Sequence, residues 1–283
     1  MQGSWATVLD FIAERIGAVD DPKAASSLAT RVAANEVLLG DGTVVDQQTG
    51  YQPGGAVYLY RYLRPEIPVP FKLTVLHQDS DIIVVDKPHF LATMPRGAHV
   101  TETVVTRVRR DLGLPDAAPA HRLDRLTAGV LMLTLRPEVR AAYQNLFARA
   151  EVRKTYAALA PLDASLSEPV TVSNRLIKAR GQLQTAVVDG EPNAVTTVRL
   201  REACGEWGVY ELSPQTGKTH QLRVHCAGLG IPIVGDPLYP VPREVAGDDF
   251  SSPLRLVAQR LEFVDPLTGS ARVFESGGSV GGG

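Results

Sequence analysis

The chain alternates apolar runs with amphipathic stretches, and this pattern predicts a mixed α and β protein. Residues 130–135 (V-L-M-L-T-L) are apolar at nearly every position, which is typical of a strand buried on both faces. Shorter apolar or alternating runs predict further strands at residues 37–39, 43–45, the end of 51–60, 74–76, 82–85, 154–159, 170–177, 194–200, 207–213 and 254–264. Helical spacing predicts helices at residues 8–16, 24–34, 101–112, 137–150 and 218–229.

Prolines and glycines divide this pattern into parts. Residues 64–70 contain three prolines, as a linker does. We therefore expect a small α/β region at residues 1–66 and a main domain at residues 67–275. The main domain should be of α+β class and rich in antiparallel strands, with residues 170–177, 194–200 and 207–213 forming an antiparallel set. The glycine-rich end, residues 276–283, should be disordered.

Composition excludes some classes of protein. Hydrophobic residues make up 44% of the chain, an ordinary value for a globular protein, and no apolar run reaches the ~18 residues of a membrane span. The first residues lack the basic segment and apolar core of a signal peptide. Two cysteines, Cys204 and Cys226, suit a reducing compartment. We therefore expect a cytoplasmic protein without a membrane partner.

Charge is unevenly distributed along the chain. The net charge is −2, which by itself argues mildly against a nucleic-acid protein. Residues 1–60 hold three basic and seven acidic residues, or −4, so the remainder carries +2. Basic residues in that remainder cluster at Arg107, Arg109 and Arg110; Arg122 and Arg125; Arg149, Arg153 and Lys154; and Arg175, Lys178 and Arg180. The clusters form either a local positive groove or ordinary solvated faces.

The segment A-H-R-L-D-R-L-T-A-G, residues 120–129, is the main candidate for chemistry. It places Asp124 between Arg122 and Arg125, just before the buried strand. A carboxylate flanked by guanidiniums is kept ionised at neutral pH. The same pattern also suits a surface carboxylate in a structural ion-pair network.

Four blocks of this sequence resemble the RluA-type pseudouridine synthases. Residues 121–129 are similar to the family's H-R-L-D-x-x-T-S-G, differing mainly at Ala128. Residues 216–239, T-G-K-T-H-Q-L-R-V-H to G-D-P-L-Y, resemble a second family segment nearly residue for residue. Residues 82–88 (I-I-V-V-D-K-P) and 154–158 (K-T-Y-A-A) agree in the same order. The chain departs from the family at residues 256–258, where L-V-A replaces L-H-A.

The resemblance implies a fold, an activity and a set of site residues. The fold would be a long, mixed, largely antiparallel sheet with a central cleft, preceded at residues 1–66 by a region loosely similar to an S4 RNA-binding module. The activity would be isomerisation of RNA uridines to pseudouridine without metal or cofactor, by a monomer. Asp124 would be nucleophile or base, Arg223 would pair with it, and Tyr156 would stack on the uracil. The substrate-binding residues would be Arg122, which fills the gap left by the flipped base, His121, Thr127, Lys154 and Gln221.

Other functions compete with this one. A non-catalytic RNA-binding protein on the same fold would be expected to lose Asp124, Tyr156 or Arg223, and all three are present. A carboxylate hydrolase would need a second positioned carboxylate, for which Asp86 and Asp236 are the candidates. A zinc site from His220, His225 and Cys226 lacks a C-x-x-C pair. The segments at residues 88–91 and 95–97 are similar to members that act on large-subunit ribosomal RNA or on tRNA stem-loops.

Overall fold

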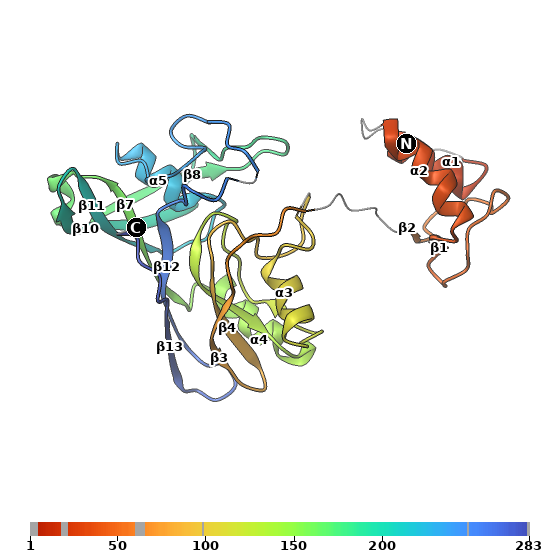
Figure 1. Ribbon diagram of the computed structural model, residues 1–283. Helices are drawn as coiled ribbons and strands as arrows, with labels where there is room; N and C mark the ends of the chain where they lie inside the picture. The colour runs from red at the N-terminus through yellow and green to blue at the C-terminus, as the bar shows by residue number, and fades with distance from the viewer. Residues whose placement is uncertain (1–4, 18–21, 60–65, 98, 248, 282–283) are drawn as a thin grey trace. The chain divides into compact units, whose positions relative to one another are not determined.

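The computed structural model describes residues 5–17, 22–59, 66–97, 99–247 and 249–281, which belong to two compact units (Figure 1). The first unit is Met1–Arg64 and the second is Pro65–Gly283. The predicted linker at residues 64–70 begins outside the described residues and is irregular from residue 66 onward.

The first unit is a pair of helices beside a small sheet. Helices α1 (Val8–Gly17) and α2 (Pro22–Ala33) precede an antiparallel pair, β1 (Val37–Leu39) and β2 (Val57–Leu59). α1 begins with a reciprocal cap, in which the Asp10 amide donates to Thr7 Oγ1 (3.1 Å) and the Thr7 amide donates to Asp10 Oδ2 (3.0 Å). The strand predicted at residues 43–45 is wrong, because β1 pairs with β2 over its whole length and Val44 adds only an isolated bridge.

A single mixed sheet forms the second unit. Its main path runs β3-β4-β6-β12-β7-β11-β10-β8-β9, with β5 added at β6 and β13 at β12. Only the β6–β12 pair is parallel among these strands, as described for residues 66–281. The bounds are β3 Thr74–Gln78, β4 Ile82–Lys87, β5 Ala118–Pro119, β6 Ala128–Thr134, β7 Arg153–Pro161, β8 Val170–Ile177, β9 Ala186–Val188, β10 Ala194–Cys204, β11 Trp207–Pro214, β12 Leu256–Val264 and β13 Ala271–Glu275.

Helices cover both faces of the sheet. α3 (Val104–Asp111) packs on the face formed by alternate residues of β4 and β6, such as Ile83 and Leu131, while α4 (Pro137–Ala148) packs on the opposite face against Val84 and Met132. β6 is therefore buried at every position, which explains its continuous apolar run. On the other half of the sheet, α5 (Gln221–Gly228) packs against β7, β10 and β11.

The two halves of the sheet meet at the β6–β12 pair, and Gly129 makes that pair possible. Gly129 lies opposite Ala258 with φ +110°, and a Cβ there would stand 2.3 Å from the Ala258 carbonyl oxygen. Only glycine fits such a close approach. The glycine that follows the H-R-L-D-R-L-T-A segment thus allows the backbones of β6 and β12 to pair directly after the candidate catalytic turn.

The structure corrects the sequence prediction at the end of the chain. Residues 276–281 pack on the main unit, although their composition predicted disorder. Ser276 Oγ donates to the Asp86 carboxylate at 2.9 Å, the Gly277 amide donates to Asp86 Oδ2 at 2.9 Å, and Val280 is buried beside Ala128 and Val257. A partly buried carboxylate that accepts hydrogen bonds from the segment and one buried apolar side chain are enough to order this glycine-rich stretch. Strands β5, β9 and β13 were not predicted.

Candidate active site

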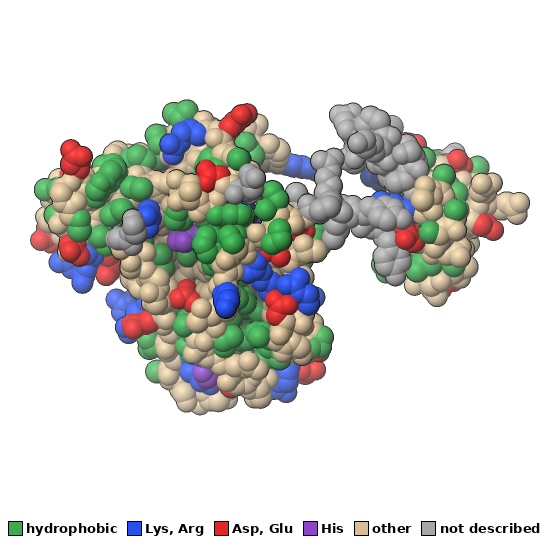
Figure 2. All heavy atoms as spheres, viewed as in Figure 1, with side chains coloured by type: hydrophobic (Ala, Val, Ile, Leu, Met, Phe, Trp, Pro, Cys, Tyr) green, Lys and Arg blue, Asp and Glu red, His purple; other side chains and the backbone are tan. Residues whose placement is uncertain are grey.

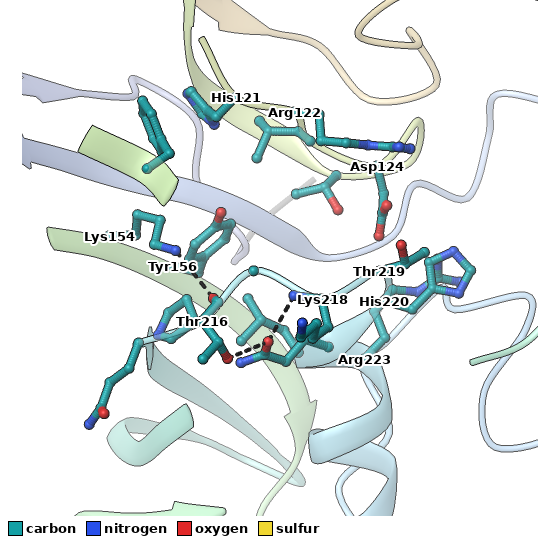
Figure 3. A pocket seen from close by; sticks show the side chains of 18 of the residues that line it. His121, Arg122, Asp124, Lys154, Tyr156, Thr216, Lys218, Thr219, His220 and Arg223 are labelled. Atoms are coloured by element: carbon teal, nitrogen blue, oxygen red, sulfur yellow. Dashed lines mark hydrogen bonds between the residues drawn. The ribbon is translucent and has the colours of Figure 1, made fainter. Parts of the chain in front are cut away.

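A cavity of about 510 Å³ lies where the segment before β6, the α4–β7 connection and the β11–α5 connection come together (Figure 3). Every site residue predicted from the sequence lines it: Asp124, Tyr156, Arg223, Arg122, His121, Thr127, Lys154 and Gln221. These residues are separated by up to about a hundred positions along the chain, so the fold brings all of the predicted set together.

The turn that carries Asp124 is fixed from both sides. The Leu123 amide donates to Thr93 Oγ1 (3.1 Å), which in turn donates to the Leu123 carbonyl (2.8 Å). The Thr127 amide donates to the Asp124 carbonyl (3.1 Å), and Thr127 itself is buried. Figure 3 shows the Asp124 carboxylate directed into the cavity. A partly buried carboxylate on such a rigid turn has a defined orientation.

Lys87 supports the same turn from below and was not singled out by the sequence. Its Nζ is fully buried and donates to the carbonyl oxygens of Leu91 (2.7 Å), Pro88 (3.0 Å) and Arg125 (3.2 Å). Burial lowers the pKa of Lys87 to about 7, although the nearby Asp124 charge acts in the opposite direction. The available signal was a lysine at the end of an otherwise mostly apolar strand, I-I-V-V-D-K.

Tyr156 extends from β7 into the cavity. Burial raises the pKa of its hydroxyl, and the charge of Asp124 raises it further. The side chain therefore remains a neutral phenol at any working pH. In Figure 3 the Tyr156 ring borders the space that the Asp124 carboxylate faces. An aromatic face and a carboxylate on one small space suit a planar base attached to a sugar.

Arg223 pairs with a different carboxylate from the expected one. Its Nε donates to Asp236 Oδ2 (2.7 Å) and its Nη2 donates to Asp236 Oδ1 (2.6 Å), and both side chains are buried. Within the described chain, Arg223 forms no ion pair with Asp124. Burial opposes the charge on Arg223, but the Asp236 hydrogen bonds and charge raise its pKa, with Asp124 adding a smaller contribution. The expected fork of Arg223 on Asp124 is not formed in this structure, because Nε and Nη2 of Arg223 both donate to Asp236.

Gln221 organises the wall of the cavity. Its Oε1 accepts from Thr216 Oγ1 (2.8 Å) and the Lys218 amide (3.0 Å), while its Nε2 donates to the Val195 carbonyl (3.0 Å) and Thr196 Oγ1 (2.9 Å). The side chain is buried and each of its polar atoms has two protein partners. Gln221 therefore holds the 216–221 loop in place and has no group left over for a substrate.

Two histidines in the cavity wall are neutral. His121 Nε2 accepts from the Met132 amide (3.1 Å) and its ring stacks on Phe147 at 4.3 Å; burial and the Lys154 charge lower its pKa to about 3. His220 has φ +57°, and its Nδ1 lies 2.9 Å from the Tyr239 hydroxyl. Burial lowers the pKa of His220 to about 4. A left-handed conformation at a residue other than glycine often marks a functional site.

The remaining predicted residues lie at the rim and the floor. Arg122 is exposed at the mouth of the cavity. Lys154 Nζ donates to the Thr216 carbonyl (3.2 Å), and burial lowers its pKa. This hydrogen bond from Lys154 connects β7 with the loop at residues 216–221.

The possible zinc ligands are used elsewhere. His225 Nε2 lies at hydrogen-bond distance, 3.0 Å, from Asn174 Oδ1. Cys226 is buried in the apolar cluster between α5 and the sheet. Among the described residues, no three His, Cys, Asp or Glu side chains are grouped as metal ligands would be. No described helix has the length and apolar character needed to cross a lipid bilayer.

Comparison with known proteins gives consistent matches. A family model described as RNA pseudouridylate synthase matches residues 81–228. The ribosomal large subunit pseudouridine synthase D of Xanthomonas campestris pv. campestris is 32% identical over 262 residues, covering 86% of this chain and 78% of the relative. The tRNA pseudouridine synthase C of Vibrio cholerae serotype O1 is 32% identical over 224 residues, covering 72% and 91%. The solved structure of human RNA pseudouridylate synthase domain containing 1 has a TM-score of 0.58 and 25% identity, covering 73% of this chain and 84% of that one.

Proposed function

This chain belongs to the RluA-type RNA pseudouridine synthase family, and we propose that Asp124 is the carboxylate with which it converts uridine in structured RNA to pseudouridine. The reaction breaks the bond between uracil N1 and ribose C1′, turns the base, and joins C5 to C1′. The C5 proton is lost and N1 gains a proton, so substrate and product are isomers. The observation that carries this assignment is the Asp124 carboxylate facing a cavity that Tyr156 borders.

Asp124 has two possible routes, and both need its present environment. As a nucleophile it would attack the sugar, and as a base it would remove a ribose proton. Either route requires an ionised carboxylate that is not already engaged. In the described chain Asp124 forms no ion pair with Arg122, Arg125 or Arg223, so its oxygens are available to a bound nucleoside.

A hydrolase with two carboxylates is disfavoured by the partners of the other candidates. Asp86 accepts hydrogen bonds from Ser276 and Gly277, and Asp236 is occupied by Arg223. Neither residue lines the cavity that contains Asp124. Asp124 is thus left as a single carboxylate, which suits the isomerase and not a paired general acid and base.

We assign Tyr156 to the uracil and Arg122 to the RNA outside the cavity. The Tyr156 ring offers a stacking surface, and its neutral hydroxyl suits the position from which the C5 proton departs. Exposed Arg122 at the cavity mouth can fill the space that a flipped uridine leaves in its stem-loop. His121, Thr127 and Lys154 would shape the floor that receives the base.

Ribosomal RNA and tRNA stem-loops are the proposed substrates. One similar relative is named for the large ribosomal subunit and another for tRNA. The second unit has Lys and Arg side chains near the middle of the face seen in Figure 2, interspersed with acidic ones, which suits a local RNA contact on a near-neutral protein. We propose that the chain acts in the cytoplasm as a monomer.

Pseudouridine mapping identifies the substrate. Total RNA is compared between cells with the gene, cells without it, and cells complemented with Asp124→Asn. We expect one or a few uridine positions to lose pseudouridine without the gene and to stay unmodified with Asp124→Asn. Identical maps in all three would refute the function. If cells without the gene grow poorly and the gene with Asp124→Asn restores growth as well as the wild-type gene does, the chain would act as a non-catalytic RNA-binding protein.

We propose that the first unit is a degenerate S4-like cap that contributes little to RNA binding. Its helix–helix–strand order is loosely similar to an S4 module, but residues 1–60 carry −4 net charge and cannot neutralise many phosphates. Deletion of residues 1–64 should weaken RNA affinity by less than about tenfold. A loss of more than about a hundredfold, with the second unit still folded, would show that the first unit is an RNA-binding module.

We propose that the reaction needs no metal or cofactor, because isomerisation transfers no electrons and no group to a carrier. Turnover of a stem-loop transcript whose fold does not depend on magnesium should survive excess EDTA. Loss of turnover that zinc alone restores would contradict this assignment.

A further inference from the structure

We propose that a second, arginine-lined cavity beside the catalytic turn binds a backbone phosphate of the substrate RNA, an inference that rests on the proposed function. This arginine cavity has a volume of about 500 Å³ and does not include Asp124 or Tyr156. Its cationic lining residues are Arg125, Arg243 and Arg255, which come from the catalytic turn, the loop after α5 and the residue just before β12.

The three guanidiniums lack carboxylate partners. Among the described residues, none of the three forms an ion pair. Arg125 and Arg255 are partly buried, and burial lowers the pKa of Arg125. Partly buried cations without a counter-ion are costly, and an anionic ligand would relieve that cost.

Two acidic residues of the arginine cavity cancel part of this charge. Glu244 and Asp249 also line it. Asp249 Oδ1 accepts from the Ser251 amide (2.9 Å) and from Ser251 Oγ (2.5 Å), so it is turned to its own loop. Three arginines against these two carboxylates leave the arginine cavity with a net charge of +1, which favours an anion.

The walls of the arginine cavity are held by unusual backbone. Phe90 has φ +66°, and Arg125 Nη1 lies 3.5 Å from its carbonyl oxygen. Gly235 has φ +77°, and a Cβ there would stand 2.3 Å from the Pro253 carbonyl oxygen. A bulky residue in the left-handed region persists only where the surrounding structure enforces it. Phe90 and Gly235 thus hold two parts of the cavity wall in fixed conformations.

The arginine cavity lies next to the catalytic cavity, and residues adjacent in sequence line the two. Arg125 directly follows Asp124, and Gly235 and Pro237 flank Asp236, the partner of Arg223. Arg243 Nη2 also donates to the Asp236 carbonyl (2.8 Å). A uridine held at Asp124 would have neighbouring phosphates of its own strand within reach of the arginine cavity.

Phosphate is the ligand class that these donors recognise. Planar guanidiniums bind phosphate oxygens through paired N–H donors, and phosphate contacts fix the register of a protein on a nucleic acid without reading its sequence. A phosphate held in the arginine cavity would fix where the strand enters the catalytic cavity. A free nucleotide offers the same chemistry, so the test separates the two sources.

The test measures how RNA affinity depends on salt. Arg243→Ala, Arg255→Ala and the double variant are titrated against a fluorescein-labelled stem-loop RNA with uridines in its loop, by anisotropy, at salt from about 50 to about 200 mM. Each lost phosphate contact should lower the slope of log affinity against log salt by about 0.7–0.9. We expect the double variant to lose about one contact and roughly tenfold in affinity at the lowest salt. Arg201→Ala removes an exposed arginine paired with Glu211 and should match the wild type.

Several outcomes overturn the proposal. A double variant with the slope and affinity of Arg201→Ala would show that no phosphate binds there. If the double variant loses affinity for labelled UMP while the slope of its RNA affinity against salt stays that of the wild type, the arginine cavity binds a free nucleotide instead. If the alanine variants unfold by thermal melting, Arg255→Lys and Arg243→Gln are compared, and the glutamine variant alone should lose slope. Binding requires no turnover, so a failure to form pseudouridine would refute the proposed function and leave this test readable.

Discussion

Arg223 and Asp236 form a buried bidentate ion pair next to the catalytic cavity, with N–O distances of 2.7 and 2.6 Å. Asp236 Oδ1 also accepts from the Leu238 amide (2.8 Å) and the Tyr239 amide (3.1 Å), and the Arg223 guanidinium lies over the Tyr239 ring at 5.2 Å. Asp236 therefore fixes α5 to the segment that follows it. Arg223 also lines the cavity that contains Asp124, so this ion pair holds part of the cavity wall.

Breaking this pair should destabilise the protein. Removing one partner of a buried pair typically costs about 3–5 kcal/mol, because the other charge stays buried. We expect Asp236→Ala to lower the melting temperature of the second unit by on the order of 10 °C. Arg223→Lys cannot reproduce the fork and should lose both stability and turnover. In the exposed Arg110–Asp111 pair, Asp111→Ala should leave the melting temperature nearly unchanged, because water screens the interaction between these charges. Equal melting temperatures for Asp236→Ala and Asp111→Ala would contradict the buried-clamp assignment.

Gly129 should not tolerate a side chain. In Gly129→Ala the new Cβ would meet backbone atoms of Ala258 at 2.3–2.7 Å, and φ +110° adds strain. The β6–β12 seam would have to open, so we expect little folded protein by circular dichroism and thermal melting. Gly228→Ala, in α5, meets nothing within 4 Å and should fold normally. A stable Gly129→Ala variant would mean that the seam is more adaptable than its geometry indicates.

Tyr156→Phe should separate stacking from proton chemistry. The ring is retained and the hydroxyl is lost, so RNA affinity should change little while the single-turnover rate falls by about a hundredfold or more. Tyr143→Phe is the matched control: it removes a buried hydroxyl that donates to Asp265 Oδ2 (3.1 Å), outside the cavity. Its stability should fall and its rate should not. A Tyr156→Phe variant within a few-fold of wild type would remove the hydroxyl from the mechanism.

His121 should make stability depend on pH. Its folded-state pKa of about 3 lies below the ordinary 6.5, so the unfolded chain binds the proton first as pH falls. The contribution of neutral His121 to the free energy of unfolding is fully present above about pH 6.5. It is lost as the pH falls from about 6.5 to 3, and the loss reaches about 2 kcal/mol by pH 5. His220 and His225, with pKa values of about 4, add to the same trend. Melting temperatures of His121→Gln should fall less steeply with acid than those of wild type or His77→Gln. Parallel curves for all three would show that folding does not lower the pKa of His121.

Sequence patterns predicted most of the fold where one physical signal dominates. The apolar run of β6 predicted burial on both faces, and α3 and α4 cover it. The bounds predicted for β8, residues 170–177, are those observed. β5, β9 and β13 were missed because two- to five-residue strands on a sheet edge carry little periodic signal.

The sequence predicted which residues line the candidate site, but it did not predict the hydrogen bonds and ion pairs that these residues form. Family-like blocks brought Asp124, Tyr156 and Arg223 to one cavity. The blocks could not show which carboxylate Arg223 binds, since Asp124 and Asp236 both lie in blocks that resemble the family. The turn after α5 brings Asp236 to the Arg223 guanidinium, and the sequence pattern does not show this. Lys87 was missed for a similar reason, because a lysine after a strand reads as a solvated end until its carbonyl partners are known.

The central claim is that Asp124 carries the isomerisation of uridine. The most direct measurement is single-turnover tritium release from a stem-loop RNA labelled at uridine C5, with wild type and Asp124→Asn compared at saturating protein. We predict release with the wild type, and none above background with Asp124→Asn, although the variant melts and binds the RNA as the wild type does. Tritium release by Asp124→Asn at a substantial fraction of the wild-type rate would contradict the account.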